Sequence, residues 1–231
     1  MKAPSIAPRR SGRPSRPVAR ERLLELSQQA FAEFGYAGAS MEEIARRAGL
    51  RKASLFHHFS SKSKLYAETI GAATADLGRL VADAARREGT FLDRLDGLGA
   101  TVVDYLGKHP PVARLLVREI VDGGSYLRGQ GAEFVRVVLA EIGAFLDTGM
   151  GEGVIARQDT AHLAASIIGL HLFYFAVSEF TTELTGEDVF APRMIAARRT
   201  SVREQVRRLC GAPVVSAAGP RGAHRRRTEE R

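Results

Sequence analysis

Two adjacent histidines, His57 and His58, are the residues of this 231-residue chain that most suggest chemistry. They lie in the stretch GLRKASLFHHFSSKSK, residues 49–64, and paired histidines can bind a metal ion or transfer protons. In a helix, neighbouring side chains point about 100° apart, so the two rings cannot easily share one ion. The interval 50–64 holds no cysteine, aspartate or glutamate to complete a metal site. The stretch is instead basic, with lysine or arginine at 51, 52, 62 and 64, which favours a negatively charged partner.

Other groups that could perform chemistry do not combine into a site. His162 and His171 are nine residues apart on one expected helix and therefore face opposite sides. We find no P-loop, GxSxG, HExxH or GxGxxG motif. Cys210 is the only cysteine, so no disulfide can form within the chain, which fits a reducing cytosol. The sequence therefore predicts a cytoplasmic protein that is not an enzyme and has no metal or cofactor.

Positive charge is concentrated at the two ends of the chain. Residues 1–64 carry a net charge of +8, residues 65–220 carry −3, and residues 221–231 carry +3. This asymmetry predicts that a polyanion docks at the N-terminal end. Because residues 1–18 are basic and rich in proline, we expect a disordered arm there, and a disordered tail over 212–231. A merely solubilising arm is the alternative, but it does not explain the basic cluster at 51–64.

Helical periodicity dominates the remainder, and no alternating strand pattern of useful length is present. We therefore predict an all-α fold of about nine helices, with one domain over 19–65 and a larger one over 66–211. The expected helices are 20–34, 41–48, 52–59, 61–87, 90–108, 111–121, 132–147, 160–182 and 192–210, with glycine-rich breaks at 122–131 and 148–153. The most apolar run, Leu163–Val177, has 15 residues, whereas a membrane span needs about 20. We expect a buried helix there and no membrane association.

The smaller domain contains two short helices joined by a tight turn. Ser40, followed three residues later by Glu43, predicts a reciprocal capping box, and Gly49 ends the helix that it starts. In the next helix Leu55 and Phe59 are one turn apart and should face the core. The residues expected on its outer side are Lys52, Ala53, Phe56 and His57. A helix-turn-helix of this kind places its second helix in the major groove of DNA.

The segment SMEEIARRAGLRKASLFHHFSSKSKL, residues 40–65, resembles the DNA-binding segment of the TetR family of bacterial transcriptional repressors. The similarity rests on the capping serine, on the Ile-Ala and Ala-Gly pairs, and on the Leu-aromatic-x-His-Phe run at 55–59, followed by Lys62 and Leu65. It is specific over about residues 20–67. The remainder is similar to the family only in its length and its expected helical layout.

This resemblance implies a role for each matching residue. Ser40 and Lys62 would hold phosphates, Lys52, Ala53 and Ser54 would meet base edges or the groove wall, and His57 and His58 would contact backbone or bases. The family commonly has a tyrosine, whose hydroxyl reaches a phosphate, at the position of Phe56. That contact should be missing here, and Arg51 is a candidate to compensate for it. Arg13 and Arg16 of the arm would either enter an adjacent minor groove or attract phosphates without sequence preference.

For the larger domain, the resemblance implies a ligand-binding and dimerisation unit. The residues proposed to line its cavity are Phe91, Leu95, Tyr105, His109, Leu116, Arg118, Phe134 and His171, with His109 or Arg118 meeting a polar group of a mostly apolar ligand. The expected helix 160–182 is apolar nearly all round, so it must be buried on two sides. With helix 192–210 it would form a four-helix dimer interface; the alternative is a fully internal helix of a monomer. The interface candidates are Ala165, Gly169, Leu172, Phe173, Val202 and Val206.

Taken together, these features predict a homodimeric regulator that binds a palindromic operator in double-stranded DNA and responds to a small-molecule effector. We expect a repressor that the effector releases from its operator. One alternative is a helical small-molecule-binding or catalytic protein whose basic end is incidental. Another is an architectural protein that binds DNA without sequence preference.

Overall fold

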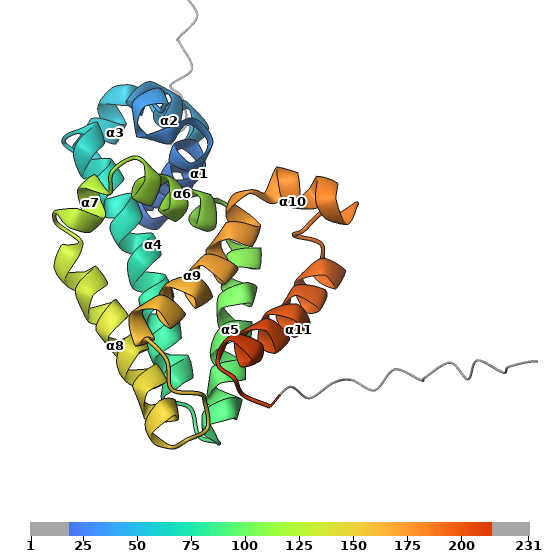
Figure 1. Ribbon diagram of the computed structural model, residues 1–231. Coiled ribbons are helices and arrows are strands. Elements are labelled where there is room, and N and C mark those ends of the chain that lie inside the picture. Colours follow the sequence, from blue (N-terminus) through green and yellow to red (C-terminus); the bar gives the residue numbers. More distant parts are fainter. Residues whose placement is uncertain (1–18, 214–231) are drawn as a thin grey trace, which may run out of the picture. The chain divides into compact units, whose positions relative to one another are not determined.

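The computed structural model describes residues 19–213, and every regular element in this range is an α-helix. In chain order the helices are α1 (Arg20–Gly38), α2 (Met41–Arg47), α3 (Lys52–His58), α4 (Lys62–Ala85), α5 (Phe91–Lys108), α6 (Pro110–Val121), α7 (Ser125–Arg128), α8 (Ala132–Gly151), α9 (Thr160–Ala176), α10 (Ser178–Thr185) and α11 (Pro192–Leu209) (Figure 1). The all-α prediction is confirmed. The described range contains eleven helices instead of about nine, because α7 and a separate α10 were not expected.

The described chain divides into two compact units, residues 19–69 (unit 1) and residues 70–213 (unit 2). The division falls inside α4, which begins in unit 1 and ends in unit 2. The arm expected over 1–18 lies outside the described residues, as does nearly all of the tail expected over 212–231.

Unit 1 packs α1, α2, α3 and the first turns of α4 around one apolar core. Leu23, Phe31, Ile44, Leu55 and Leu65, one or two from each helix, are all completely buried. Full burial of such side chains contributes about 1.5–3 kcal/mol each. These contacts fix α3, which is too short to be stable by itself.

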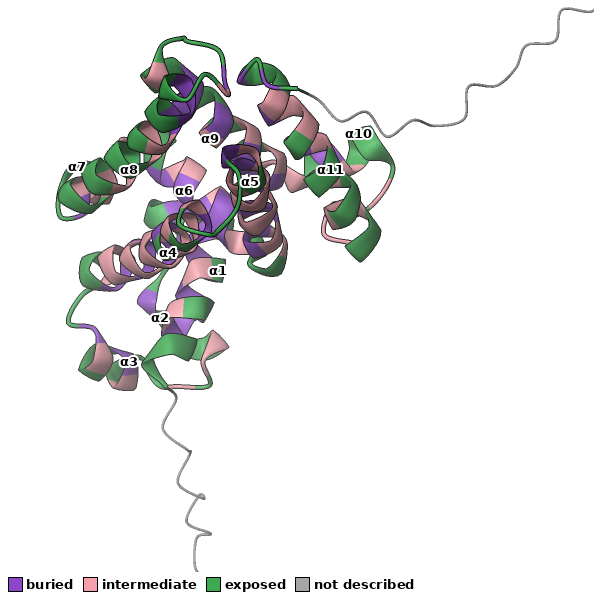
Figure 2. Ribbon diagram, turned by 90° about the horizontal axis from the view of Figure 1, so that it is seen from below, coloured by how far each residue is buried: buried purple, intermediate pink, exposed green. Residues whose placement is uncertain are grey.

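Unit 2 is built around α9, which packs against α6 and α8, while α5 packs against α11 (Figure 1). Val103 and Leu106 of α5, Val112 and Leu115 of α6, and Phe175 of α9 form its fully buried centre. Figure 2 shows the buried residues concentrated on the inner sides of α5 and α9, whereas α10 is mostly exposed.

The helix expected over 160–182 is in fact two helices. α9 ends at Ala176 and α10 starts at Ser178, and their axes differ by 82°. Carbonyl groups at the end of α9 have side-chain donors: Arg114 Nε donates to the Ala176 carbonyl at 3.2 Å, and Thr181 Oγ1 to the Tyr174 carbonyl at 3.1 Å. These bonds replace the helical partners that the bend removes. Between residues 19 and 213 no single helix could cross a membrane by length and hydropathy, although the bent α9–α10 pair meets that test when joined.

The break expected at 148–153 is also displaced, because α8 continues to Gly151. Gly149 lies inside this helix, where a Cβ would come within 2.3 Å of the Phe91 ring. Here glycine makes room for an aromatic ring from α5 and does not end the helix.

Candidate nucleic-acid interface and internal cavity

The start of α2 is fixed by Ser40, whose Oγ accepts a hydrogen bond from the Glu43 backbone N–H at 3.1 Å. Only this half of the predicted capping box forms. The Glu43 carboxylate is instead bound by Arg46 and Arg47, with Nη2 and Nε respectively at 2.8 Å from Oε1. Hydrogen bonds from Arg46 and then Arg47 lower the pKa of Glu43 to about 2. Arg47 also pairs with Glu33 of α1, so the basic charges of α2 are largely balanced within unit 1.

The turn into α3 is a tight backbone reversal. Gly49 has a φ of +66°, and the Leu50 N–H bonds the Ala45 carbonyl at 2.9 Å, which closes α2 with a left-handed residue. Leu55 and Phe59 then bury completely, so the prediction that they face the core is confirmed. Arg20 of α1 lies 4.3 Å from the Phe59 ring centroid and donates to the His58 carbonyl at 2.9 Å. The C-terminal end of α3 is therefore held by α1, and the turn at Gly49 and Leu50 joins its N-terminal end to α2.

The opposite side of α3 faces solvent. Its exposed residues are Arg51, Lys52, Ala53, Phe56 and His57, while Ser54 and His58 are half-buried. Lys52 Nζ is 3.9 Å from a Glu42 carboxylate oxygen, and both side chains are more than half exposed. Among residues 19–213, no group of three or more histidine, cysteine, aspartate and glutamate side chains is placed to hold a metal ion. This face combines cationic, small and aromatic side chains on a helix held rigidly from behind.

Lys62 makes internal contacts that the sequence did not indicate. Its Nζ donates to the Ala37 carbonyl at 3.2 Å and lies 4.6 Å from the centroid of the Tyr36 ring. Tyr36 in turn packs on Tyr66, with ring centroids 4.9 Å apart. The Lys62 ammonium has three N–H donors, so it could bind a phosphate only in addition to the Ala37 carbonyl and the Tyr36 ring. Arg13 and Arg16 lie outside the described residues.

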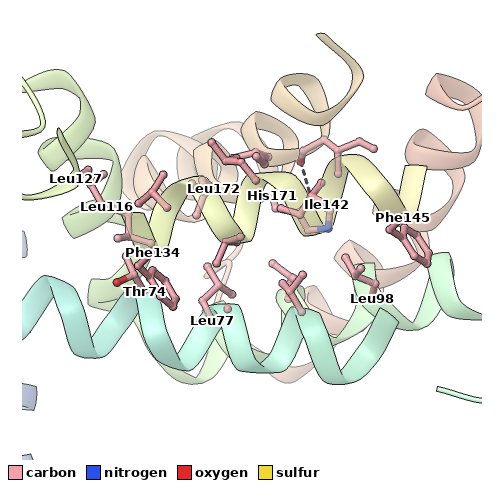
Figure 3. Close-up of a pocket in the computed structure, with 18 of the residues that line it drawn as sticks. Thr74, Leu77, Leu98, Leu116, Leu127, Phe134, Ile142, Phe145, His171 and Leu172 are labelled. Atoms are coloured by element: carbon pink, nitrogen blue, oxygen red, sulfur yellow. Dashed lines mark hydrogen bonds between the residues drawn. The ribbon is translucent and has the colours of Figure 1, made fainter. Parts of the chain in front are cut away.

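Unit 2 contains a cavity of about 210 Å³, partly open to solvent, between α4, α5, α6, α7, α8 and α9 (Figure 3). Its walls are leucine, isoleucine, valine, phenylalanine and one glycine, apart from Thr74 and His171, and no charged side chain lines it. Both polar groups are bound to their own helices: Thr74 Oγ1 donates to the Ile70 carbonyl at 2.9 Å, and His171 Nδ1 lies 2.8 Å from the Ile167 carbonyl. Burial lowers the pKa of His171, which favours a neutral ring. The cavity is therefore suited to an uncharged, apolar occupant.

Half of the proposed lining residues reach this cavity. Leu95, Leu116, Phe134 and His171 line it, whereas Phe91, Tyr105, His109 and Arg118 do not. Phe91 stacks on Phe145 with centroids 4.7 Å apart, and burial raises the pKa of Tyr105 to about 12. His109 is exposed at the end of α5. The proposed polar contact through His109 or Arg118 is therefore wrong for this cavity.

A second hollow lies on the surface formed by α9, α10 and α11, and several of the large apolar side chains around it are exposed to solvent. Phe173, Phe180 and Leu184 are 59%, 60% and 74% exposed. Gly169 belongs to this surface, with no atom within 4 Å of a Cβ built on it, and Ala165 is also exposed. We name Gly169, Phe173, Phe180 and Leu184 the α9–α10 apolar face. Large exposed apolar faces are typical of interaction sites.

Three of the proposed interface residues do not reach the surface of unit 2. Leu172, Val202 and Val206 are buried within unit 2, at 8%, 1% and 4% exposure. Leu172 lines the cavity, and Val202 faces Gly99 of α5. Phe180 and Leu184 were missed, because a straight helix through residue 182 would have placed them differently from α10.

A helix-turn-helix unit followed by a larger helical unit with an apolar cavity defines a DNA-binding regulator with a sensor domain. Residues 23–69 match the model described as bacterial regulatory proteins, tetR family. Residues 92–206 match the model described as the tetracyclin repressor-like C-terminal domain. The chain belongs to the TetR family of bacterial regulatory proteins.

Known relatives agree with this assignment. The HTH-type transcriptional activator FasR of Mycolicibacterium smegmatis is 45% identical over 65 residues, which are 28% of this chain and 30% of FasR. The TetR family regulator PfmR of Thermus thermophilus has a similar structure, with a TM-score of 0.66 and 20% identity over 83% of this chain and 98% of PfmR. AibR, crystallised with isovaleryl coenzyme A and operator DNA, has a TM-score of 0.63 and 16% identity over 80% of this chain and 96% of AibR.

Proposed function

We propose that this protein is a homodimeric transcriptional repressor, whose α3 reads operator DNA and whose unit 2 senses an apolar effector. The observation that carries the proposal is the exposed face of α3, with Lys52, Ala53 and His57 outward and Leu55 and Phe59 fully buried behind them. It lies within the segment that matches the family's N-terminal model. On this proposal, residues 19–65 bind DNA, and residues 66–211 bind the effector and form the dimer. We place the protein in the cytoplasm, at the nucleoid.

On this proposal, Arg51 and Lys52 approach the DNA at the start of α3, where helix-turn-helix proteins contact base edges. Ser54, His57 and His58 follow along the groove, and Ser40 contacts a phosphate from the start of α2. Arg13 and Arg16 add phosphate or minor-groove contacts from the arm. Two recognition helices related by a two-fold axis require a palindromic operator, with half-sites about one helical turn or a small multiple apart.

The dimer forms through the α9–α10 apolar face together with α11. Its exposed phenylalanines would leave water on association, and Gly169 would allow close approach of the two copies of α9. Leaving Phe173, Phe180 and Leu184 in water is unfavourable by an amount that grows with the apolar area exposed.

The effector occupies the cavity of unit 2. Because no charged side chain lines the cavity, the buried part of the effector is an acyl chain or a ring system, and any charged part stays outside. AibR, whose fold is similar, was crystallised with an acyl coenzyme A and operator DNA, which supports this class of ligand. Release from DNA requires that the effector bind the DNA-free arrangement more tightly than the DNA-bound one.

Fluorescence anisotropy tests the proposal, with a labelled duplex from upstream of the protein's own gene. We expect saturable binding with a Kd of about 10⁻⁸ M or tighter that survives an excess of unrelated DNA. Binding that unrelated DNA abolishes would indicate an architectural protein. Absence of any binding would indicate a small-molecule-binding or catalytic protein.

A further inference from the structure

Two glycines on α4 each receive an aromatic side chain from the segment that contains α7 and α8. Gly71 and Gly78 are seven residues apart, two helical turns, and therefore share one face of α4. A Cβ on Gly71 would lie 2.7 Å from the hydroxyl oxygen of Tyr126. A Cβ on Gly78 would lie 2.8 Å from Cζ of Phe134 and 3.2 Å from Cγ2 of Val138. The two distances to the aromatic side chains are too short for a real Cβ, so the aromatic groups rest directly on the α4 backbone.

The Phe134 contact is part of the cavity wall. Gly78 and Phe134 both line the cavity, together with Thr74 and Leu77 of α4, and Figure 3 shows Phe134 directed at this helix. The Phe134 side chain is nevertheless 37% exposed. It is therefore incompletely packed and has space into which it can rotate.

Tyr126, in contrast, is fixed from several sides. Its backbone N–H and that of Leu127 donate to Oε1 of the buried Glu119, at 2.7 and 3.1 Å. Its ring also packs on Gly131, where a Cβ would come within 2.4 Å of Cε1. Of the two aromatic contacts on α4, the one made by Phe134 is therefore held by fewer neighbouring groups.

From this asymmetry we propose that Phe134 and Gly78 form a latch that reports occupancy of the cavity to α4. An occupant that takes the space of the ring moves Phe134 off Gly78, and α4 loses this contact while the one between Tyr126 and Gly71 remains. The occupant is an uncharged chain or ring, as the apolar walls require. This inference rests on the proposed effector function. It adds the residues that couple the effector to the helix continuing into the DNA-binding unit.

Hydrogen exchange of the amides at 70–85, measured by mass spectrometry on the full chain, tests the latch without DNA. Gly78→Ala should displace the ring and accelerate exchange in this segment roughly fivefold. Helix propensity alone predicts the opposite, since alanine stabilises helices relative to glycine. Gly97→Ala on α5 is the matched control, because its Cβ would make only an ordinary 3.9 Å contact. In the Phe134→Ala background, Gly78→Ala should accelerate exchange much less, because the remaining neighbour of its Cβ is Cγ2 of Val138 at 3.2 Å.

Occupancy can be imposed without knowing the effector. Ile142 lines the cavity, so Ile142→Cys can be labelled with hexyl methanethiosulfonate, with the methyl reagent as the small control. The native Cys210 is completely buried, and burial raises the pKa of its thiol to about 11, so it should remain unlabelled. We expect the hexyl group, but not the methyl group, to accelerate exchange at 70–85, and Phe134→Ala to remove this difference.

Equal exchange in the hexyl- and methyl-labelled proteins would overturn the latch, as would unchanged or slower exchange in Gly78→Ala. The outcomes for the two proposals are separable. An exchange response in a protein that binds no specific DNA would support the latch and refute the proposed function. Release of DNA on hexyl labelling, without a change in exchange at 70–85, would support the proposed function and refute the latch.

Discussion

Arg207 of α11 and Asp96 of α5 form a two-point ion pair within unit 2, with Nε 2.9 Å from Oδ1 and Nη2 2.6 Å from Oδ2. Their side chains are only 11% and 22% exposed. Arg207→Ala leaves the aspartate largely buried and unpaired, so we expect a loss of about 2–3 kcal/mol in the free energy of unfolding. Urea denaturation checks this value.

The control for that experiment is Arg193→Ala, which breaks the more exposed pair with Glu187. Water screens exposed ion pairs, so this variant should differ little from the wild type. Equal effects of the two substitutions would show that burial of the Arg207–Asp96 pair has no special role.

Acid sensitivity of unit 1 should depend on Glu43. Its folded-state pKa of about 2 is below the ordinary value of 4.5, so its stabilising contribution is present above pH 4.5 and is lost as the pH falls toward 2. Glu43→Gln should therefore remove part of the decrease in stability between pH 4.5 and 2, measured by thermal unfolding. Glu25→Gln is a control, because Glu25 is an exposed partner of Arg22 on the same unit. An identical pH profile for wild type and Glu43→Gln would contradict the arginine contacts.

Phe56→Tyr should strengthen DNA binding. Phe56 is 42% exposed on the outer side of α3, so a hydroxyl can be added there without burying it. One new phosphate contact is worth about 1 kcal/mol, or roughly fivefold in Kd. Anisotropy titration of the variant measures this change, with Phe34→Tyr, which is equally exposed on α1, as the control. Unchanged affinity would mean that position 56 does not approach a phosphate.

A charge on the α9–α10 apolar face should separate the subunits. Nothing lies within 4 Å of a Cβ at Gly169, so Gly169→Glu should fold normally while placing a carboxylate in the interface. Light scattering should show a monomer for this variant and a dimer for Ala140→Glu, which adds the same charge to an exposed position of α8. A dimeric Gly169→Glu protein would place the interface elsewhere.

Sequence patterns predict this structure best where local rules and packing agree. The burial of Leu55 and Phe59 and the exposure of Phe56 follow from helical spacing alone. The bend between α9 and α10 could not be predicted, because no glycine or proline stands at Val177. Arg114 and Thr181 supply the hydrogen bonds that the bend requires, and Arg114 is more than 60 residues away in the chain.

The residues that line the cavity could also be predicted only in part from the sequence. Leu95, Leu116, Phe134 and His171 were identified, but Phe91 and Tyr105 have the same apolar spacing and pack in the core instead. The packing roles of Gly78 and Gly149 could not be predicted from the local sequence. A glycine in a helical pattern indicates only a less stable helix, unless the aromatic ring that packs on it is known. Such roles depend on contacts between distant segments, which the pattern along one helix does not contain.

We propose that α3 reads DNA through its exposed N-terminal face, and two single substitutions test this role most directly. Lys52→Ala and His57→Ala should each weaken specific binding to the upstream duplex by about tenfold, while the dimer and its thermal stability remain unchanged. Lys108→Ala, which removes a similar exposed charge at the end of α5, should leave the affinity unaltered. Wild-type operator affinity in both the Lys52→Ala and His57→Ala proteins would contradict the assignment of α3 as the recognition helix.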